Sequence, residues 1–293
     1  MTTLRIATRG SALALIQARL VEAALRRLGV AVELVPVVSA GDVRAPGTSP
    51  GEGVFVTALE QALLTGEADV AVHSAKDMPL VAEPDLVVAA YPERADPRDA
   101  LVGASLAEAA AGARVGTDSL RRAGFLLRLR PDLRHQPLHG NVDTRLAKLD
   151  AGETDLLVLA AAGLDRLGLA DRIAARFSPH EVTPAGGQGA LAVQARRSDR
   201  RVRDLLAALD RPDLRLEVDA ERAVLEATGG TCRSPVGALA RVAGDSVELL
   251  AAAVMPDGTH HHLVVLSGAW GEAPRLAARA GRELLERVPL AEL

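Results

Sequence analysis

The turn-like stretch GGTCRSP contains Cys232, the only cysteine among 293 residues. One thiol cannot form an internal disulfide and supplies too few ligands for a structural metal site. Three interpretations remain for this cysteine: a small buried side chain, an incidental residue, or a sulfur kept for covalent chemistry. Because a glycine-rich turn exposes its side chains and the adjacent Arg233 favours the thiolate, the sequence points to covalent chemistry.

A second reactive candidate is the pair Lys76 and Asp77 in HSAKDMP. A carboxylate just after a buried strand can stabilise a developing cation and transfer protons. A turn residue ahead of Pro79 is the competing interpretation for Asp77. Lys76 favours function, because all but two of the 34 basic residues are arginines and Lys148 is the only other lysine.

Cationic and hydroxyl side chains follow several predicted strands, where they could bind an anionic ligand. Arginine binds carboxylates through paired hydrogen bonds, which lysine cannot do. For any single arginine, a solvated surface or a helix cap explains the residue equally well. The candidates are Thr8, Arg9, Ser11, Ser74, Thr117, Ser119, Arg121, Arg122, Arg145 and Arg166.

The histidines carry weaker signals. His73 is interpreted as a packed residue at the end of a strand. The run of histidines at 260–262 could bind a metal, but neighbouring side chains of a strand point to opposite faces. A solvated hairpin is therefore predicted there, and no metal site is expected anywhere.

Strand-like and helix-like segments alternate in the first third of the chain. Ser11 is a plausible N-cap, and Gly29 is a plausible stop for the helix that follows. Strands separated by helices predict a mostly parallel sheet with helices on both faces. The segments are a strand at 4–8, a helix at 11–29, a strand at 30–38, a glycine-rich loop at 41–53, a helix at 54–65 and a strand at 69–72.

Two short similarities recur in the same order. RIATRGSAL (5–13) resembles RVGTDSLRR (114–122), and TGEADVAV (65–72) resembles AGETDLLV (151–158). They predict two similar lobes. In open parallel sheets ligands lie at the carboxyl ends of strands, where helix N-termini suit anions. Two facing lobes would therefore enclose an anionic ligand in a cleft.

The remainder of the chain predicts a strand that returns to the first lobe, within 184–195, and then a change of pattern from about residue 212. We expect an α/β fold of two doubly wound lobes, similar to periplasmic binding proteins, and a small α+β domain. The expected domains are 1–95 with 188–208, 98–184, and 212–293. The last contains a helix at 216–228, strands at 247–254 and 262–267, and a helix at 272–288.

The bulk composition narrows the class of protein. A net charge of −4 and a pI near 6.0 give no reason to expect nucleic acid or an anionic membrane as a partner. No apolar run reaches the roughly 18 residues of a spanning helix. The start, MTTLRIATRG, lacks the pattern of a secretory signal. A cytoplasmic protein is expected.

Taken together, nine stretches resemble the porphobilinogen deaminase family, also called hydroxymethylbilane synthases. They follow the family's order from residue 5 to about residue 237, and the tail is similar only in general shape. The stretches are RIATRGSALAL, ELVPVVSAGD, HSAKDMP, ERADPRDA, VGTDSLRR, GNVDTRLAKL, AAAGLDRLGL, PAGGQGALA and CRSP.

The resemblance implies a three-domain transferase of porphyrin and heme biosynthesis that works as a monomer. Members of this family join four porphobilinogen molecules head to tail into hydroxymethylbilane and release ammonia. The product grows on a dipyrromethane cofactor held by a thioether to a cysteine, which Cys232 matches. Asp77 matches the catalytic carboxylate, and Lys76 lies beside it.

The resemblance also assigns further residues, because every pyrrole carries an acetate and a propionate. It places Lys76, Asp77, Thr117, Ser119, Arg121, Arg122, Asn141 and Gln188 at the cofactor. It places Arg9, Ser11, Ser74, His139, Arg145 and Arg166 at the substrate. It places Asp42, Glu52 and Phe55 in a mobile loop over the cleft.

Three positions depart from the family pattern. His139 replaces a typical arginine, Glu52 stands where many relatives have lysine, and Thr231 replaces a glycine. A charge-assisted hydrogen bond is worth roughly 1.5–3 kcal/mol, so losing cations weakens the hold on carboxylates. We expect slower or weaker turnover than in a typical relative, more so at high pH, where His139 is neutral. Unchanged activity in His139→Arg would contradict this.

Two other classes of function fit parts of the sequence. A two-lobed solute-binding or sensor protein would share the cleft. The missing signal peptide and the Cys232 turn argue against it. A degenerate family member would bind tetrapyrrole fragments without polymerising them, and His139 and Glu52 favour that alternative. Cys232, Asp77 and Lys76 argue for an active enzyme.

Overall fold

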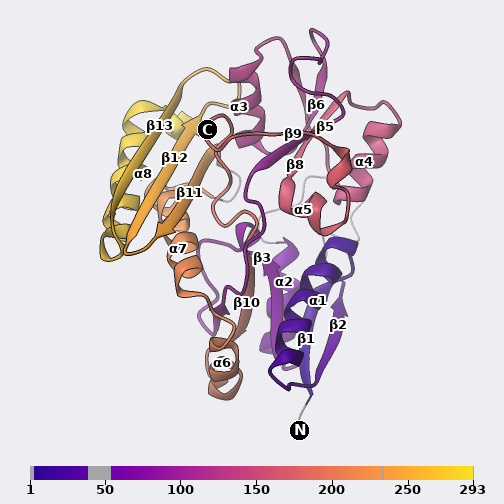
Figure 1. The fold of residues 1–293 in the computed structure, drawn as a ribbon, viewed down its shortest axis with the longest axis vertical. Helices are drawn as coiled ribbons and strands as arrows, with labels where there is room; N and C mark the ends of the chain where they lie inside the picture. Colours follow the sequence, from indigo (N-terminus) through magenta and orange to yellow (C-terminus); the bar gives the residue numbers. More distant parts are fainter. Residues whose placement is uncertain (1–2, 39–53, 232–233, 293) are drawn as a thin grey trace. The chain divides into compact units, whose positions relative to one another are not determined.

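The computed structural model describes residues 3–38, 54–231 and 234–292, and Figure 1 shows the course of the chain. The chain forms two compact units. The first unit is Met1–Ala95 with Ala190–Arg215, and the second unit is Asp96–Gly189 with Leu216–Leu293.

The first unit is built on a five-stranded sheet with the order β2-β1-β3-β10-β4. β1 runs parallel to β2 and β3, whereas β10 runs antiparallel to β3 and β4. Because β10 is antiparallel to both of its neighbours, β4 runs in the same direction as β1, β2 and β3, and the prediction of a mostly parallel sheet is confirmed with β10 as the one reversed strand. The predicted return of a strand within 184–195 to the first lobe is also confirmed, because β10 belongs to this sheet. The strands are β1 (Leu4–Arg9), β2 (Val32–Val37), β3 (Val70–Ser74), β4 (Leu86–Ala90) and β10 (Leu191–Arg196).

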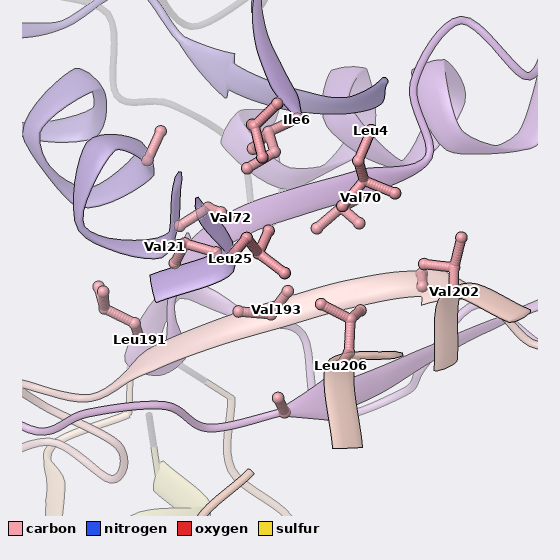
Figure 2. Packing of buried hydrophobic residues seen from close by; sticks show 14 residues of the cluster. Leu4, Ile6, Val21, Leu25, Val70, Val72, Leu191, Val193, Val202 and Leu206 are labelled. Atoms are coloured by element: carbon pink, nitrogen blue, oxygen red, sulfur yellow. The ribbon is translucent and has the colours of Figure 1, made fainter. Parts of the chain in front are cut away.

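Helices cover both faces of this sheet. Side chains of α1 (Ala12–Arg27) and α6 (Arg200–Ala207) share one core with Ile6, and those of α2 (Val54–Leu64) share another with Ala7. Ile6 and Ala7 face opposite ways because successive strand residues alternate. Figure 2 shows the first core, which includes Leu4, Val21, Leu25, Val70, Val72, Leu191, Val193, Val202 and Leu206.

The predicted signals at the ends of α1 are confirmed. Ser11 Oγ accepts a hydrogen bond from the backbone N–H of Ala14 at 3.4 Å. Gly29 follows the helix with φ +79°, in the left-handed region that favours glycine. Local chemistry therefore fixes this helix at both ends.

The second unit contains a sheet of the same pattern, with the order β7-β6-β8-β5-β9. β6 runs parallel to β7 and β8, and β5 runs antiparallel to β8 and β9. The two sequence similarities fall on equivalent strands, β1 with β6 and β3 with β8, so the prediction of two similar lobes is confirmed. The strands are β5 (Asp99–Val102), β6 (Arg114–Gly116), β7 (Arg134–Gln136), β8 (Leu156–Ala160) and β9 (Ile173–Arg176).

Helices again cover both faces of the second sheet. α3 (Leu120–Leu129) buries Phe125 in a core with Val115. α4 (Val142–Asp150) and α5 (Ala161–Arg166) contribute to the core on the other face, and the 3-10 turn η2 (Ala170–Arg172) leads into β9. Both sheets are thus doubly wound, as predicted.

The second unit also contains an antiparallel sheet, β11-β12-β13, followed by the 3-10 turn η3 (Trp270–Glu272), α8 (Ala273–Arg287) and the 3-10 turn η4 (Leu290–Glu292). The sequence pattern predicted only two of these strands. The missed strand is β11, which contains Gly237. A Cβ at this position would lie 2.4 Å from Thr183 O, so the strand needs a glycine there, and glycine weakens the strand pattern of the sequence. The strands are β11 (Val236–Ala243), β12 (Ser246–Val254) and β13 (His261–Ala269).

The helix predicted at 216–228 is α7 (Pro212–Ala227), which begins four residues earlier because proline suits the first helical turn. The C-terminal sheet and the second lobe fall within one unit. The predicted division into three domains therefore stays a prediction. Its bounds are 1–95 with 188–208, 98–184, and 212–293.

The prediction of a solvated histidine hairpin is wrong for two of its three residues. The His261 ring packs edge-on against Phe125 with ring centroids 5.6 Å apart, and burial lowers the pKa of His261 to about 4. His262 Nε2 lies 2.9 Å from Glu283 Oε1 on α8. The two side chains thus serve different contacts, as alternation along a strand requires.

Candidate active site

Several predicted site residues of the first unit lie at one edge of its sheet. β1 ends at Arg9 and β3 ends at Ser74, and the two strands are parallel neighbours. Parallel strands end at the same edge, so Arg9 and Ser11 lie at the edge that holds Ser74. Gln17 Nε2 on α1 donates to Ser74 Oγ at 3.0 Å, which ties the helix to this edge.

Lys76 and Asp77 occupy the 3-10 turn η1 (Ala75–Asp77), directly after β3. The turn is held by two backbone hydrogen bonds, from Ala75 N–H to Ala190 O at 2.9 Å and from Met78 N–H to Ala75 O at 3.2 Å. Lys76 is half-buried and Asp77 is exposed. An exposed carboxylate on a fixed turn can meet a cationic group of a ligand.

His73 belongs to the core of the first unit, as predicted. Its Nε2 lies 3.0 Å from Gln194 Oε1, and Gln194 Nε2 donates to Glu60 Oε1 at 2.9 Å. Burial lowers the pKa of His73 to about 4. A neutral, enclosed imidazole of this kind supports the sheet and not the chemistry of a site.

Thr117 and Ser119 shape the turn from β6 into α3. Thr117 is buried, and its Oγ1 accepts a hydrogen bond from Ser119 N–H at 3.2 Å. Ser119 Oγ accepts one from Arg122 N–H at 3.4 Å and caps α3. This turn is equivalent to the one in which Ser11 caps α1.

Arg121 and Arg122 are buried and share one carboxylate. Arg121 Nη1 lies 2.6 Å from Asp99 Oδ2, and Arg122 Nε lies 2.8 Å from Asp99 Oδ1. Arg122 Nη1 also donates to Val158 O at 3.2 Å. Two guanidiniums against one carboxylate leave this group with a net positive charge.

Gln188 completes this buried group. Its Nε2 donates to Asp99 Oδ1 at 3.0 Å and to Pro97 O at 2.7 Å, and its Oε1 accepts from Arg122 Nη2 at 3.3 Å. Burial alone would raise the pKa of Asp99, but the charges of Arg121 and Arg122 outweigh it and hold that pKa well below its ordinary value. Asp99 therefore stays ionised.

His139 lies at the edge where β6 and β7 end. Its Nδ1 is hydrogen-bonded to Asp118 Oδ2, and Arg145 Nη2 lies 3.8 Å from the same oxygen. Arg145 Nε donates to Gly140 O at 2.8 Å. Sequence reasoning missed both Asp118 and Asp99, although each stands inside a stretch quoted for the family resemblance.

The remaining predicted residues of the second unit lie at the ends of two helices, α4 and α5. Asn141 is exposed at the start of α4, where its side chain makes no capping bond. Arg166 ends α5 and donates from Nη2 to Gly189 O at 2.9 Å. The expected roles of Asn141 and Arg166 in binding the cofactor and the substrate stay predictions.

The predicted anchor and part of the predicted loop lie outside the described residues. These are Cys232, Asp42 and Glu52. Phe55 lies in the first turn of α2, and its side chain is not described. Next to Cys232, the backbone N–H of Thr231 donates to Ser234 Oγ at 2.8 Å.

The described residues contain neither a metal-binding cluster nor a membrane-spanning helix. Among residues 3–38, 54–231 and 234–292, no three His, Cys, Asp or Glu side chains come together in a way that could hold a metal ion. In the same ranges no helix has the length and apolar character needed to cross a membrane.

Two family models match the chain in succession. Residues 4–204 match the porphobilinogen deaminase dipyromethane cofactor binding domain, and residues 215–286 match the porphobilinogen deaminase C-terminal domain. The chain belongs to the porphobilinogen deaminase family. The family predicted from nine short stretches is therefore confirmed, including the C-terminal part that had resembled it only in general shape.

Similar proteins of this family are named porphobilinogen deaminase. One from Acidothermus cellulolyticus is 48% identical over 295 residues, covering 97% of this chain and 89% of the relative. One from Xanthomonas oryzae pv. oryzae is 51% identical over 257 residues, covering 85% of this chain and 84% of the relative.

Solved structures similar to this porphobilinogen deaminase family member include periplasmic binding proteins. A substrate-binding protein of an ABC transporter from Coxiella burnetii is 16% identical, with a TM-score of 0.45 over 72% of this chain and 94% of that chain. A second substrate-binding domain of an amino acid transporter from Streptococcus pneumoniae is 14% identical, with a TM-score of 0.45 over 78% and 95%.

Proposed function

We propose that this chain is a hydroxymethylbilane synthase, which condenses four porphobilinogen molecules head to tail and releases one ammonia at each condensation. The observation that carries this proposal is the match of both family domains over most of the chain. The sheet edges of both units also carry the cationic and hydroxyl residues that a substrate with two carboxylates per ring requires.

The family model also names the dipyrromethane cofactor. We propose that it is held by a thioether to Cys232, the only sulfur nucleophile of the chain. The net positive group of Arg121, Arg122 and Asp99 fits a ligand that carries acetate and propionate. When bound, the cofactor supplies the free pyrrole carbon on which the product grows.

Asp77 is the proposed catalytic carboxylate. Loss of ammonia from the aminomethyl group of porphobilinogen leaves a cationic azafulvene, and an ionised carboxylate nearby lowers the energy of that cation. Formation of the new carbon–carbon bond at the methylene would displace a ring proton, and the base that accepts this proton would be Asp77. Asp77 is exposed on η1 and can serve both steps, with Lys76 beside it to bind a carboxylate.

The remaining roles follow from charge and position. We propose that Arg9, Ser11 and Ser74 bind substrate carboxylates at the edge of the first sheet. Thr117, Ser119, Asn141 and Gln188 line the cofactor site, and Arg145 and Arg166 bind substrate. Asp42, Glu52 and Phe55 are proposed to act on the bound substrate as loop residues. The enzyme acts as a monomer in the cytoplasm.

Intact mass of the purified protein tests this proposal, in the parent and in Cys232→Ser. We expect the parent to exceed the polypeptide mass by two linked pyrrole units and the variant to lack the excess. Ser234→Ala changes the same turn, keeps the sulfur and should keep the added mass. Porphobilinogen consumption and ammonia release would then be measured on the loaded parent.

The alternative is a family member that binds tetrapyrrole fragments without polymerising them. A parent mass that stays bare after incubation with porphobilinogen or with preformed hydroxymethylbilane would overturn the anchored cofactor. A loaded parent that releases no ammonia would favour the non-catalytic alternative. Loading in Cys232→Ser would move the attachment to another residue.

A further inference from the structure

Asp118 and His139 come from separate segments that meet at one edge of the second sheet. Asp118 lies between β6 and α3, and His139 lies between β7 and α4. β6 and β7 are parallel neighbours, so the loops after them lie side by side. The residues that share this edge include Thr117, Ser119, Asn141 and Arg145.

The contact between the two side chains fixes the histidine tautomer. An ionised carboxylate can only accept a hydrogen bond, so the proton of the shared bond must sit on His139 Nδ1. In neutral His139 the Nε2 atom is then a lone-pair acceptor. In the imidazolium both nitrogens donate. His139 Nε2 thus changes from acceptor to donor with protonation.

Few charges compensate Asp118. Its Oδ2 receives His139 and has Arg145 at 3.8 Å, whereas its Oδ1 is buried without a hydrogen-bond partner in the described part of the chain. Two other titratable groups face this loop. Lys148 Nζ on α4 donates to His139 O at 3.3 Å, and His135 Nε2 on β7 lies 2.8 Å from Thr117 O. Among these groups only His139 is hydrogen-bonded to the Asp118 carboxylate, so the net charge of the Asp118–His139 pair depends on the protonation of His139.

We propose that Asp118 is a positioning residue that holds His139 as its Nδ1–H tautomer, so that His139 binds a substrate carboxylate through Nε2 only as an imidazolium. The proposal rests on the proposed function. The neutral pair carries a net charge of −1 and a lone pair toward the ligand, and it repels a carboxylate. The protonated pair carries no net charge and presents an N–H donor.

The tautomer is measured without substrate, by nitrogen-15 NMR of histidine-labelled protein, with His139→Gln to assign the signal. We expect the Nδ1–H form in the parent and in Asp118→Asn, whose amide oxygen still accepts. In Asp118→Ala we expect a shift toward Nε2–H, the form that free imidazole side chains prefer. An Nε2–H parent, or an unchanged signal in Asp118→Ala, would overturn the proposal.

The second part of the proposal, that His139 binds a substrate carboxylate, is tested by measuring KM for porphobilinogen from pH 6 to 9. We expect KM of the parent to rise on the order of tenfold as His139 loses its proton, and KM of His139→Arg to stay flat. Asp143→Asn removes an exposed charge from α4 and should match the parent.

The two experiments separate this inference from the proposed function. A parent that turns over porphobilinogen with a pH-independent KM overturns the role of His139 and leaves the enzyme assignment intact. A parent without turnover overturns the function, and the NMR signal of His139 still decides whether Asp118 holds the tautomer.

Discussion

Arg121 Nη1 lies 2.6 Å from Asp99 Oδ2, and the two side chains are only 4% and 0% exposed. An ion pair so enclosed is stable only while both charges are present, because either alone pays the full cost of desolvation. Asp99 also serves Arg122 through its other oxygen, so one carboxylate supports two guanidiniums.

Asp99→Asn should therefore destabilise the second unit strongly. Two buried guanidiniums would lose their counter-charge, and breaking a buried pair costs about 3–5 kcal/mol. Urea unfolding followed by circular dichroism measures the loss. Asp213→Asn removes the exposed partner of Arg211 and should cost far less. Equal effects of the two substitutions would contradict the structural role of Asp99.

The pH dependence of stability should reveal His73. Its folded-state pKa of about 4 lies below the ordinary 6.5, so the unfolded chain binds the proton first as pH falls. Stability is therefore full above pH 6.5 and declines toward pH 4, by about 3 kcal/mol if His73 acts alone. Urea unfolding of the parent between pH 4 and 7 measures this decline.

A matched pair of variants isolates that contribution. His73→Gln should make the decline shallower and leave the part that His261 contributes through its own pKa of about 4, whereas His180→Gln, at an exposed position, should retain the full decline. If His73→Gln folds and its stability still falls as steeply as that of the parent, another group causes the decline.

Gly124→Ala should destabilise the contact between α3 and the C-terminal sheet. A Cβ at this position would lie 2.5 Å from Met255 O, a backbone atom that cannot move away cheaply. The cost should be about 1–3 kcal/mol, although alanine is the better helix former by up to about 1 kcal/mol. Thermal unfolding measures it. Gly271→Ala has open space around its Cβ and should leave the midpoint nearly unchanged.

Asp77→Asn should slow ammonia release by about 10²–10⁴ when the protein carries its cofactor, since a proton-transfer and cation-stabilising group is lost. Loading with hydroxymethylbilane beforehand, checked by mass, separates turnover from cofactor assembly. Asp85→Asn changes an exposed carboxylate of the same unit and should behave as the parent. Full activity in Asp77→Asn would remove Asp77 from the mechanism.

Local signals in the sequence predicted local structure well. Ser11 and Gly29 delimit α1 as expected, because a cap and a left-handed glycine depend on neighbours along the chain. The antiparallel entry of β10 and the existence of β11 were missed, because they depend on packing against distant segments.

In the candidate site, too, the sequence predicted what depends on local signals and missed what depends on distant segments. The motifs located Lys76 and Asp77 just after a strand, where the structure has them. They could not indicate that Arg121 and Arg122 are enclosed by Asp99, which precedes them by more than twenty residues, or that Asp118 holds His139. Side-chain partners of this kind become visible only when separate strands are aligned in one sheet.

The insertion of β10 between β3 and β4 sets an order for synthesis. Its residue Leu191 pairs with Ser74, so the ribosome must make more than a hundred further residues before the first sheet can close. All five strands of the second sheet lie between Asp99 and Arg176 and emerge before β10 does. A nascent chain thus holds β3 and β4 with open edges while the later lobe can already pair its own strands, and open strand edges of this kind are prone to aggregation.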